Sequence, residues 1–174
     1  ELARVDVPPA PPRRRSKLTE LWEGYRGGLD DATPDVPTGV SLERLHTVLE
    51  QLCAVPEGFT PHKTIGKLLD SRREMAAGKK PLDWATAELL AFGTLALDGF
   101  RVRMTGQDVE RGTFSHRHSR LHDARTGASH MALQHLSASQ APVEIVNSPL
   151  SEAGVMGFEY GYALAYPDAV VLWE

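Results

Sequence analysis

The chain has 174 residues, the length of one ordinary domain, and 41% of them are hydrophobic, which is enough to fill a core. The formal net charge of -4 does not favour binding to nucleic acid or to an anionic membrane, and no apolar run is long enough to cross a bilayer. Cys53 is the only cysteine, so no internal disulfide can form, which is typical of a reducing compartment such as the cytoplasm.

Residues 1–38 are rich in proline, glycine and charge, and this composition predicts a linker or a surface crossing. The arginine run at 13–15 within it has two interpretations, an anion-binding patch or a solvated part of the linker. Residues 39–174 are expected to form the folded part of the chain. Because the chain starts on Glu and stops on an apolar run, we expect it to be a piece of a longer protein.

Three helices are predicted in the first half of the folded part. Ser41 is a suitable N-cap for the first, since leucine and valine recur at helical spacing over residues 42–52. The second is predicted over residues 61–77 and the third over 83–97. Apolar residues nearly encircle the third helix, Trp84 among them, so we expect it to be largely buried.

Strands and a further helix are predicted in the second half. Residues 100–106, "FRVRMTG", alternate apolar and basic side chains and predict one strand, and residues 143–148, "VEIVNS", predict another. A helix is expected over 149–166 and a third strand over 169–174, "AVVLWE". This alternation favours an α/β fold, a mostly parallel sheet flanked by helices that is incomplete at its C-terminal end.

Glu152 is the first candidate for chemistry. It falls in the first turn of the last predicted helix if Ser148 is the N-cap and Pro149 the first helical residue. One interpretation is a carboxylate that only complements the helix dipole. The other is a buried functional carboxylate, because ligands of open α/β sheets bind outside the carboxyl ends of the strands and a predicted strand ends just before it.

Three glycines, Gly154, Gly157 and Gly161, lie inside the same predicted helix, where each costs about 1 kcal/mol relative to alanine. Their spacing lacks the opening G-x-G of a dinucleotide-binding motif. Close packing of this helix on a strand or on a second helix, across a dimer axis for example, explains them better.

The second candidate is a histidine cluster, because five of the seven histidines lie between His116 and His135. If His116 and His118 belong to a strand, their rings share one face with that of His122 and could bind a metal. No cysteine is near and no carboxylate has a clear ligand register, so an anionic-substrate site or a purely structural role is favoured over a metal. The turn-like "RTG" at 125–127 indicates a hairpin-like excursion in this region.

Several stretches together resemble one family over roughly residues 40–174. They are "DWATAELLAFGTLALDGFRVRMTGQDVERGTFSHRH", "LQHL" and "NSPLSEAGVMGFEYGYALAYPDAVVLWE". The chain is similar there to the thiamin-diphosphate-dependent decarboxylase component of 2-oxoglutarate dehydrogenase complexes, and in particular to its transketolase-like pyrimidine-binding domain. The motifs "GTFSHRH" and "SEAGVMGFEYGYA" are specific to that family, and the arginine, alanine and valine bias resembles its actinobacterial versions.

The resemblance assigns roles to four residues. It implies that Glu152 holds the aminopyrimidine ring nitrogen of thiamin diphosphate, where a carboxylate can share a proton with the ring, and that Leu150 also contacts the cofactor. His116 and His118 are expected to be catalytic residues that contact the substrate carboxylates. The ligands of the Mg²⁺ that carries the diphosphate are expected outside this segment, which has no Gly-Asp-Gly motif and for which no metal ligand is predicted.

The resemblance therefore predicts a segment of a tricarboxylic acid cycle enzyme that decarboxylates 2-oxoglutarate and passes on the succinyl group, with a possible carboligase side activity. The implied partners are a second copy of the chain and the acyltransferase and lipoamide components of the complex, in the cytoplasm, without nucleic acid or membrane. The segment alone is expected to be inactive. A pyruvate or branched-chain 2-oxoacid dehydrogenase relative, and a non-catalytic assembly domain of the same fold, stay open as alternatives.

Overall fold

The computed structural model describes residues 17–29, 31 and 33–174, which contacts divide into two units, 1–34 and 35–174. In the first unit, α1 (Lys17–Leu21) is a single short helix without a buried side chain. The arginine run at 13–15 lies outside the described residues.

Three helices open the second unit, as the sequence predicts. They are α2 (Leu42–Leu52), α3 (Lys63–Ala76) and α4 (Trp84–Leu97). Ser41 caps α2 with its hydroxyl, and the Asp83 carboxylate caps α4 by accepting the backbone N–H of Thr86 at 2.8 Å. The centre of α4 is buried as expected, but Trp84 is 92% exposed. That part of the prediction is wrong because Trp84 is the first helical residue, ahead of the turns that face the core.

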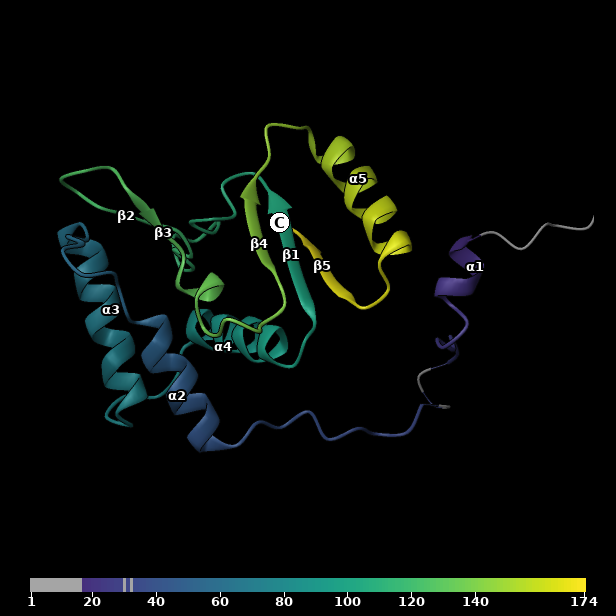
Figure 1. Cartoon of the computed structure of the whole chain (residues 1–174), viewed down its shortest axis with the longest axis horizontal. Helices are drawn as coiled ribbons and strands as arrows, with labels where there is room; N and C mark the ends of the chain where they lie inside the picture. The colour runs from purple at the N-terminus through teal and green to yellow at the C-terminus, as the bar shows by residue number, and fades with distance from the viewer. Residues whose placement is uncertain (1–16, 30, 32) are drawn as a thin grey trace, which may run out of the picture. The chain divides into compact units, whose positions relative to one another are not determined.

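The strands form a parallel sheet in the order β4–β1–β5 (Figure 1), which confirms the predicted fold class. Their bounds are β1 (Arg101–Gly106), β4 (Val143–Asn147) and β5 (Ala169–Trp173). Gly106 pairs with Asn147, and Thr105 pairs with Trp173. The carboxyl ends of all three strands therefore lie at the same edge of the sheet.

β1 directs alternate side chains to two chemically different faces of the sheet. Val102 and Met104 are buried in the apolar core that α2 and α4 share. On the opposite face, Arg103 and Thr105 bind Glu159 of α5 (Glu152–Ala165). The alternation of apolar and basic residues in the sequence therefore corresponds to a core face and an ion-paired face.

Glu159 is buried, only 4% exposed, and its carboxylate binds α5 to the sheet. Its carboxylate accepts from Arg103 Nε at 2.8 Å, from Arg103 Nη2 at 3.0 Å and from Thr105 Oγ1 at 2.8 Å. The bond to Glu159 raises the pKa of Arg103, whose guanidinium also lies 4.7 Å from the centre of the Tyr162 ring. A fully satisfied buried charge pair holds this helix in one orientation.

α5 begins at Glu152, later than predicted, and Ser151 rather than Ser148 is its N-cap. The Ser151 hydroxyl accepts the backbone N–H of Gly154 at 3.3 Å. The Ser148 hydroxyl instead accepts the N–H of Leu150 at 3.2 Å and closes a turn between strand and helix, so Pro149 precedes the helix.

The glycines of α5 do not pack closely against another part of the described chain. A Cβ atom built on Gly157 or Gly161 meets no atom within 4 Å. The predicted close approach is therefore absent among residues 17–29, 31 and 33–174. Near these glycines α5 exposes large apolar side chains, namely Met156, Phe158 and Tyr160.

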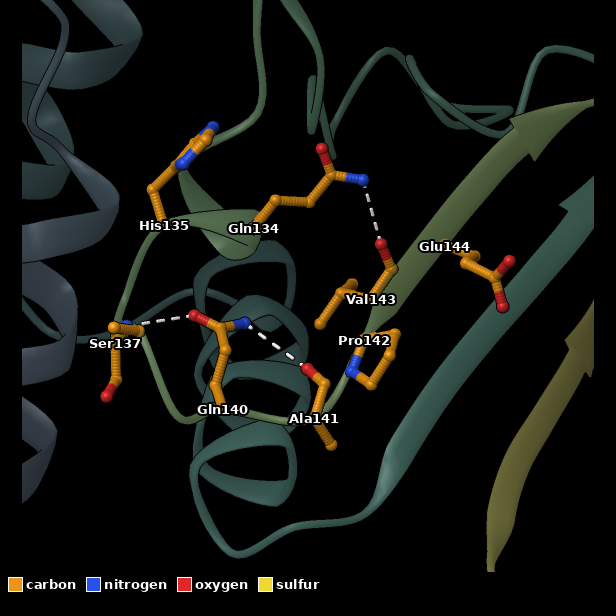
Figure 2. A pocket seen from close by; sticks show the side chains of 9 residues that line it. Gln134, His135, Ser137, Gln140, Ala141, Pro142, Val143 and Glu144 are labelled. Atoms are coloured by element: carbon orange, nitrogen blue, oxygen red, sulfur yellow. Dashed lines mark hydrogen bonds between the residues drawn. The ribbon is translucent and has the colours of Figure 1, made fainter.

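A hollow of about 570 Å³ lies along the outer edge of β4, and Figure 2 shows the side chains that line it. Gln134, at the end of the 3₁₀ helix η2 (Ala132–Gln134), donates its side-chain amide to the carbonyl of Val143 at 2.9 Å. Gln140 accepts the N–H of Leu136 at 2.7 Å and donates to the carbonyl of Leu133 at 2.7 Å. The Gln134 bond occupies a carbonyl at the edge of β4, which makes that edge less able to pair with another strand. The Gln140 bonds instead fix the segment that leads into β4.

The predicted excursion is a short antiparallel hairpin of β2 (Leu121–His122) and β3 (Ser129–His130). Asp123 organises its turn, because its carboxylate accepts the backbone N–H groups of Arg125 and Thr126, each at 2.8 Å. The same carboxylate accepts the N–H of Thr60 at 2.6 Å and so ties the hairpin to the loop before α3.

Gly106 ends β1 with φ +153°, against the backbone of β5. A Cβ atom built there would lie 1.8 Å from the carbonyl oxygen of Glu174. Only glycine lets the two strand ends approach this closely. No helix in the described part of the chain is long and apolar enough to cross a membrane.

We predict that Asp123→Asn lowers the midpoint of thermal unfolding by several degrees at neutral pH. Backbone hydrogen bonds from Thr60, Thr126 and Arg125 lower the Asp123 pKa to about 2, below the reference value of 3.8. The Asp123 carboxylate therefore stabilises the fold in full above about pH 3.8, and this contribution is lost as the pH falls through about 2. Unfolding midpoints of the variant and the parent should converge over that range. Asp70→Asn, at an exposed ion pair with Arg73, is the control and should change little at any pH. A constant gap down to pH 2 would contradict the assignment.

We also predict that Gly106→Ala lowers the free energy of unfolding by about 3 kcal/mol or more, because the backbone of Glu174 would have to move. Gly66→Ala, within α3 and with no atom within 4 Å of the new methyl group, should be neutral or stabilising by up to about 1 kcal/mol. Denaturant unfolding of both variants measures the difference, and equal stabilities would show that the close approach at Gly106 is not a constraint.

Candidate functional site

A pocket of about 600 Å³ opens where the three strands end and α5 begins. Its walls come from the end of β1, the turn after β4, the first turns of α5 and the end of β5. The lining includes Gln107, Thr113, Leu150, Glu152, Trp173 and Glu174. Ligands of open α/β sheets bind at this edge. The sequence-based placement of Glu152 beside the carboxyl end of a parallel strand is therefore confirmed.

Glu152 is the first residue of α5, and its side chain is exposed. Of the two interpretations of Glu152, the buried carboxylate is wrong as to burial, because the helix begins at the open rim of the pocket. The partial positive charge of the helix N-terminus favours a carboxylate here. Within the described residues no hydrogen-bond donor or cation pairs with it, so its carboxylate is free to bind a ligand. Leu150 is also exposed and lines the same pocket.

Glu174 provides a second carboxylate in the pocket, held in a different way. Its carboxylate accepts the backbone N–H of Thr113 at 2.8 Å and a short bond from Arg117 Nη2. Burial by itself would raise the pKa of Glu174, but these hydrogen bonds outweigh that effect and lower it. Glu174 is therefore held as an anion.

Arg117 is 2% exposed and joins three parts of the fold. Besides Glu174 at the end of β5, it binds both carboxylate oxygens of Glu88 in α4, with Nη2 at 3.2 Å from Oε2, and donates from Nη1 to the carbonyl of Val109 at 2.7 Å. Burial opposes the charge, yet the bonds to Glu88 and Glu174 raise the Arg117 pKa. Arg72 of α3 reinforces this arrangement, because it donates to the carbonyl of Arg117 at 2.9 Å.

The loop that these two arginines hold, residues 107–120, has an unusual backbone. Asp108, Ser115 and His118 have φ values of 59°, 51° and 44°, and no other described non-glycine residue has a positive φ. This region of backbone space favours glycine, so the surrounding bonds must impose it. Thr113, which lines the pocket, lies within this loop.

His116 and His118 belong to the same loop and not to a strand, so the predicted common face with His122 is wrong. The His116 ring packs against Gly112, with Nε2 at 3.4 Å from Arg117 Nη2 and 3.7 Å from Glu88. Its Nδ1 is buried and has no hydrogen-bond partner among the residues that the structure describes. Among the described residues, no group of three or more His, Cys, Asp or Glu side chains could hold a metal ion.

His118 is half-buried, and its Nε2 lies 3.0 Å from the carbonyl of Ser115. Burial, and the nearby charges of Arg72, Arg111 and His116, lower its pKa. Neither His118 nor His116 lines the pocket that contains Glu152. The structure thus brings Glu152 and Leu150 together and leaves the two histidines beside the pocket, on the loop that forms part of its wall.

Sequence reasoning missed Arg117 and Glu174. Arg117 lies between the two candidate histidines of "SHRHS", and Glu174 follows the apolar run of the last predicted strand. Their pairing joins residues 57 positions apart. No periodicity or capping rule reports such a contact.

Comparison with known proteins identifies the family. Residues 80–174, more than half of the chain, match the profile described as "Transketolase, pyrimidine binding domain". This range contains α4, every strand of the parallel sheet, α5 and the whole lining of the pocket.

Longer relatives extend the similarity toward the N-terminus. The chain is 47% identical to 2-oxoglutarate dehydrogenase, mitochondrial, of Saccharomyces cerevisiae over 94% of its length and 45% identical to the Schizosaccharomyces pombe protein of the same name over 92%. It is 46% identical to the 2-oxoglutarate dehydrogenase E1 component of Rickettsia conorii over 90%. The chain spans only 16–17% of the length of these relatives. By fold, pocket and sequence, the chain belongs to the transketolase pyrimidine-binding domain family.

Proposed function

We propose that the chain is the pyrimidine-binding segment of a thiamin-diphosphate-dependent 2-oxoglutarate dehydrogenase, in which Glu152 binds the aminopyrimidine ring of the cofactor. One observation carries the proposal: Glu152 offers an unpaired carboxylate at the start of α5, inside a pocket at the carboxyl ends of parallel strands. The names of the yeast and bacterial relatives support the choice of substrate.

The chemistry of the pocket suits an aminopyrimidine. Glu152 would bind a ring nitrogen through a charge-assisted hydrogen bond, and Gln107 offers an amide that both donates and accepts. Leu150, Val155 and Trp173 supply apolar surface for the ring. Thiamin diphosphate, when bound, supplies the carbanion chemistry that breaks the bond between the carboxylate and the keto carbon of a 2-oxo acid. The part of Glu152 is to orient the ring and to hold a proton at its nitrogen.

We infer that His116 and His118 contact the carboxylates of 2-oxoglutarate. The support is their place on the 107–120 loop, which forms part of the pocket wall through Thr113, and the names of the relatives. Pyruvate and branched-chain 2-oxo acids have one carboxylate and would gain less from two histidine contacts. The remaining parts of the site, including the diphosphate and Mg²⁺ ligands, are proposed to lie in the full-length protein outside this chain, so the chain alone would be inactive.

The assembly proposed is a homodimer in the cytoplasm that hands the succinyl group to acyltransferase and lipoamide components, with a carboligase side activity. The exposed apolar side chains of α5, Met156, Phe158 and Tyr160, and the open space at Gly157 and Gly161 support packing of a second copy on this helix. We also propose that residues 1–38 are a linker or surface crossing and that residues 39–174 are part of the pyrimidine-binding domain.

We predict that Glu152→Gln in the full-length protein lowers the rate of 2-oxoglutarate decarboxylation by about 100-fold or more, because the proton position on the cofactor ring is lost. Glu43→Gln is a matched control, since Glu43 is also an exposed first-turn glutamate, in α2. Both changes remove a helix-dipole partner, but only the first should alter turnover, measured as CO₂ release with thiamin diphosphate and Mg²⁺. Full activity of Glu152→Gln would favour the non-catalytic assembly domain.

We predict further that His118→Ala raises the KM for 2-oxoglutarate by about tenfold, with a smaller change in kcat, because a substrate contact is removed. His116→Ala should act in the same direction. The matched control is His122→Ala, an exposed hairpin histidine outside the 107–120 loop, which should leave both constants unchanged. Unchanged constants for all three variants would remove the two loop histidines from the substrate site.

A further inference from the structure

We propose that Arg117 is a positioning residue for the cofactor pocket: it fixes the 107–120 loop and the carboxylate of Glu174 into one wall of the pocket that contains Glu152. This inference rests on the proposed function, because it concerns the same pocket. It adds a second carboxylate, Glu174, with a separate role, and a buried cation, Arg117, that does not itself line the pocket.

All three guanidinium nitrogens of Arg117 are hydrogen-bonded. Its guanidinium binds Glu88 through two nitrogens, Val109 through a third contact and Glu174 through a fourth. Burying such a charge group costs desolvation energy, and apolar residues of similar size often stabilise a core equally well. A planar fork of donors does, however, fix the relative positions of its acceptors. The arrangement is therefore suited to geometry rather than to stability alone.

The backbone of the loop supports the same conclusion. Asp108, Ser115 and His118 all hold positive φ values within eleven residues of chain, and such backbone persists only where other bonds impose it. Arg117 bonds within the loop at Val109, and Arg72 holds the carbonyls of His116 and Arg117 at 3.1 and 2.9 Å. The two buried arginines therefore contribute bonds that tie this loop to the rest of the fold, beside the bond from the N–H of Glu110 to Asn147 at the end of β4.

The two carboxylates of the pocket, Glu174 and Glu152, are therefore held differently. Glu174 is bound by Arg117 and by the N–H of Thr113, so it stays charged and fixed and offers its remaining lone pairs as acceptors. Glu152 has no such partner and is left to exchange a proton with a ligand. Without Arg117, the Glu174 carboxylate loses its cation and keeps, among the described residues, only its bonds to Thr113, so this wall of the pocket is less firmly held.

The test uses the full-length protein with Arg117→Lys, Arg117→Met and Glu174→Gln. Lysine keeps the charge but not the fork, and glutamine keeps the shape but not the charge. Arg44→Met is the matched control, because Arg44 also pairs with a carboxylate, Asp98 at 2.7 Å, and with a carbonyl, Thr94 at 3.2 Å, on α4. Titration calorimetry with thiamin diphosphate and Mg²⁺ gives the cofactor Kd, and hydrogen exchange of the cofactor-free protein reports on the 107–120 loop.

We expect Arg117→Lys and Glu174→Gln each to raise the cofactor Kd at least tenfold. Glu174→Gln, which leaves the bonds of Arg117 to Glu88 and Val109 in place, should keep the KM for 2-oxoglutarate within about threefold. Arg117→Lys should also raise that KM, because the loop it loosens carries His116 and His118. The double variant should bind no more weakly than the weaker single variant, because both changes break one interaction. Exchange in the 107–120 loop should accelerate in Arg117→Lys and stay unchanged in Arg44→Met. If Arg117→Met does not fold, the lysine and glutamine variants decide the question.

Two results separate this inference from the proposed function. Parent-like cofactor Kd values in Arg117→Lys and Glu174→Gln, with only a lower unfolding temperature, would reduce Arg117 to a structural residue and overturn the inference. Failure of the parent protein itself to bind thiamin diphosphate would overturn the proposed function, and the inference with it.

Discussion

The buried guanidinium of Arg117 is the interaction on which the candidate site depends. It joins α4 through Glu88, the 107–120 loop through Val109 and the end of β5 through Glu174. Since a buried charge tolerates only well-placed acceptors, these three segments have one relative arrangement. The pocket beside Glu152 takes its shape from that arrangement.

Different interactions form the core and position the site, and they act on opposite faces of the sheet. The apolar face of β1 packs on α2 and α4, and this core requires only side chains of suitable size. The opposite face binds α5 through the buried bonds of Arg103 and Thr105 to Glu159. Because directional bonds position α5, its first residue, Glu152, lies beside the ends of the strands. A purely apolar contact would allow the helix to slide.

Local rules explain what could be predicted from the sequence. Caps such as Ser41 and Asp83, and regular apolar spacing, depend on residues within one or two turns, so the helices and the parallel sheet were predictable. The start of α5 was misjudged because Ser148 and Ser151 can both cap, and only the structure shows which hydroxyl closes the preceding turn. The prediction that the histidine rings share one face of a strand was wrong, because the positive φ of His118 is incompatible with a regular strand.

An experimental structure of the full-length protein with thiamin diphosphate and Mg²⁺ would show directly whether Glu152 binds the pyrimidine ring. We expect a ring nitrogen within hydrogen-bond distance of the Glu152 carboxylate, about 2.6–3.2 Å, in the pocket between α5 and the ends of β1 and β5. A cofactor ring bound elsewhere, with Glu152 still facing solvent, would contradict it.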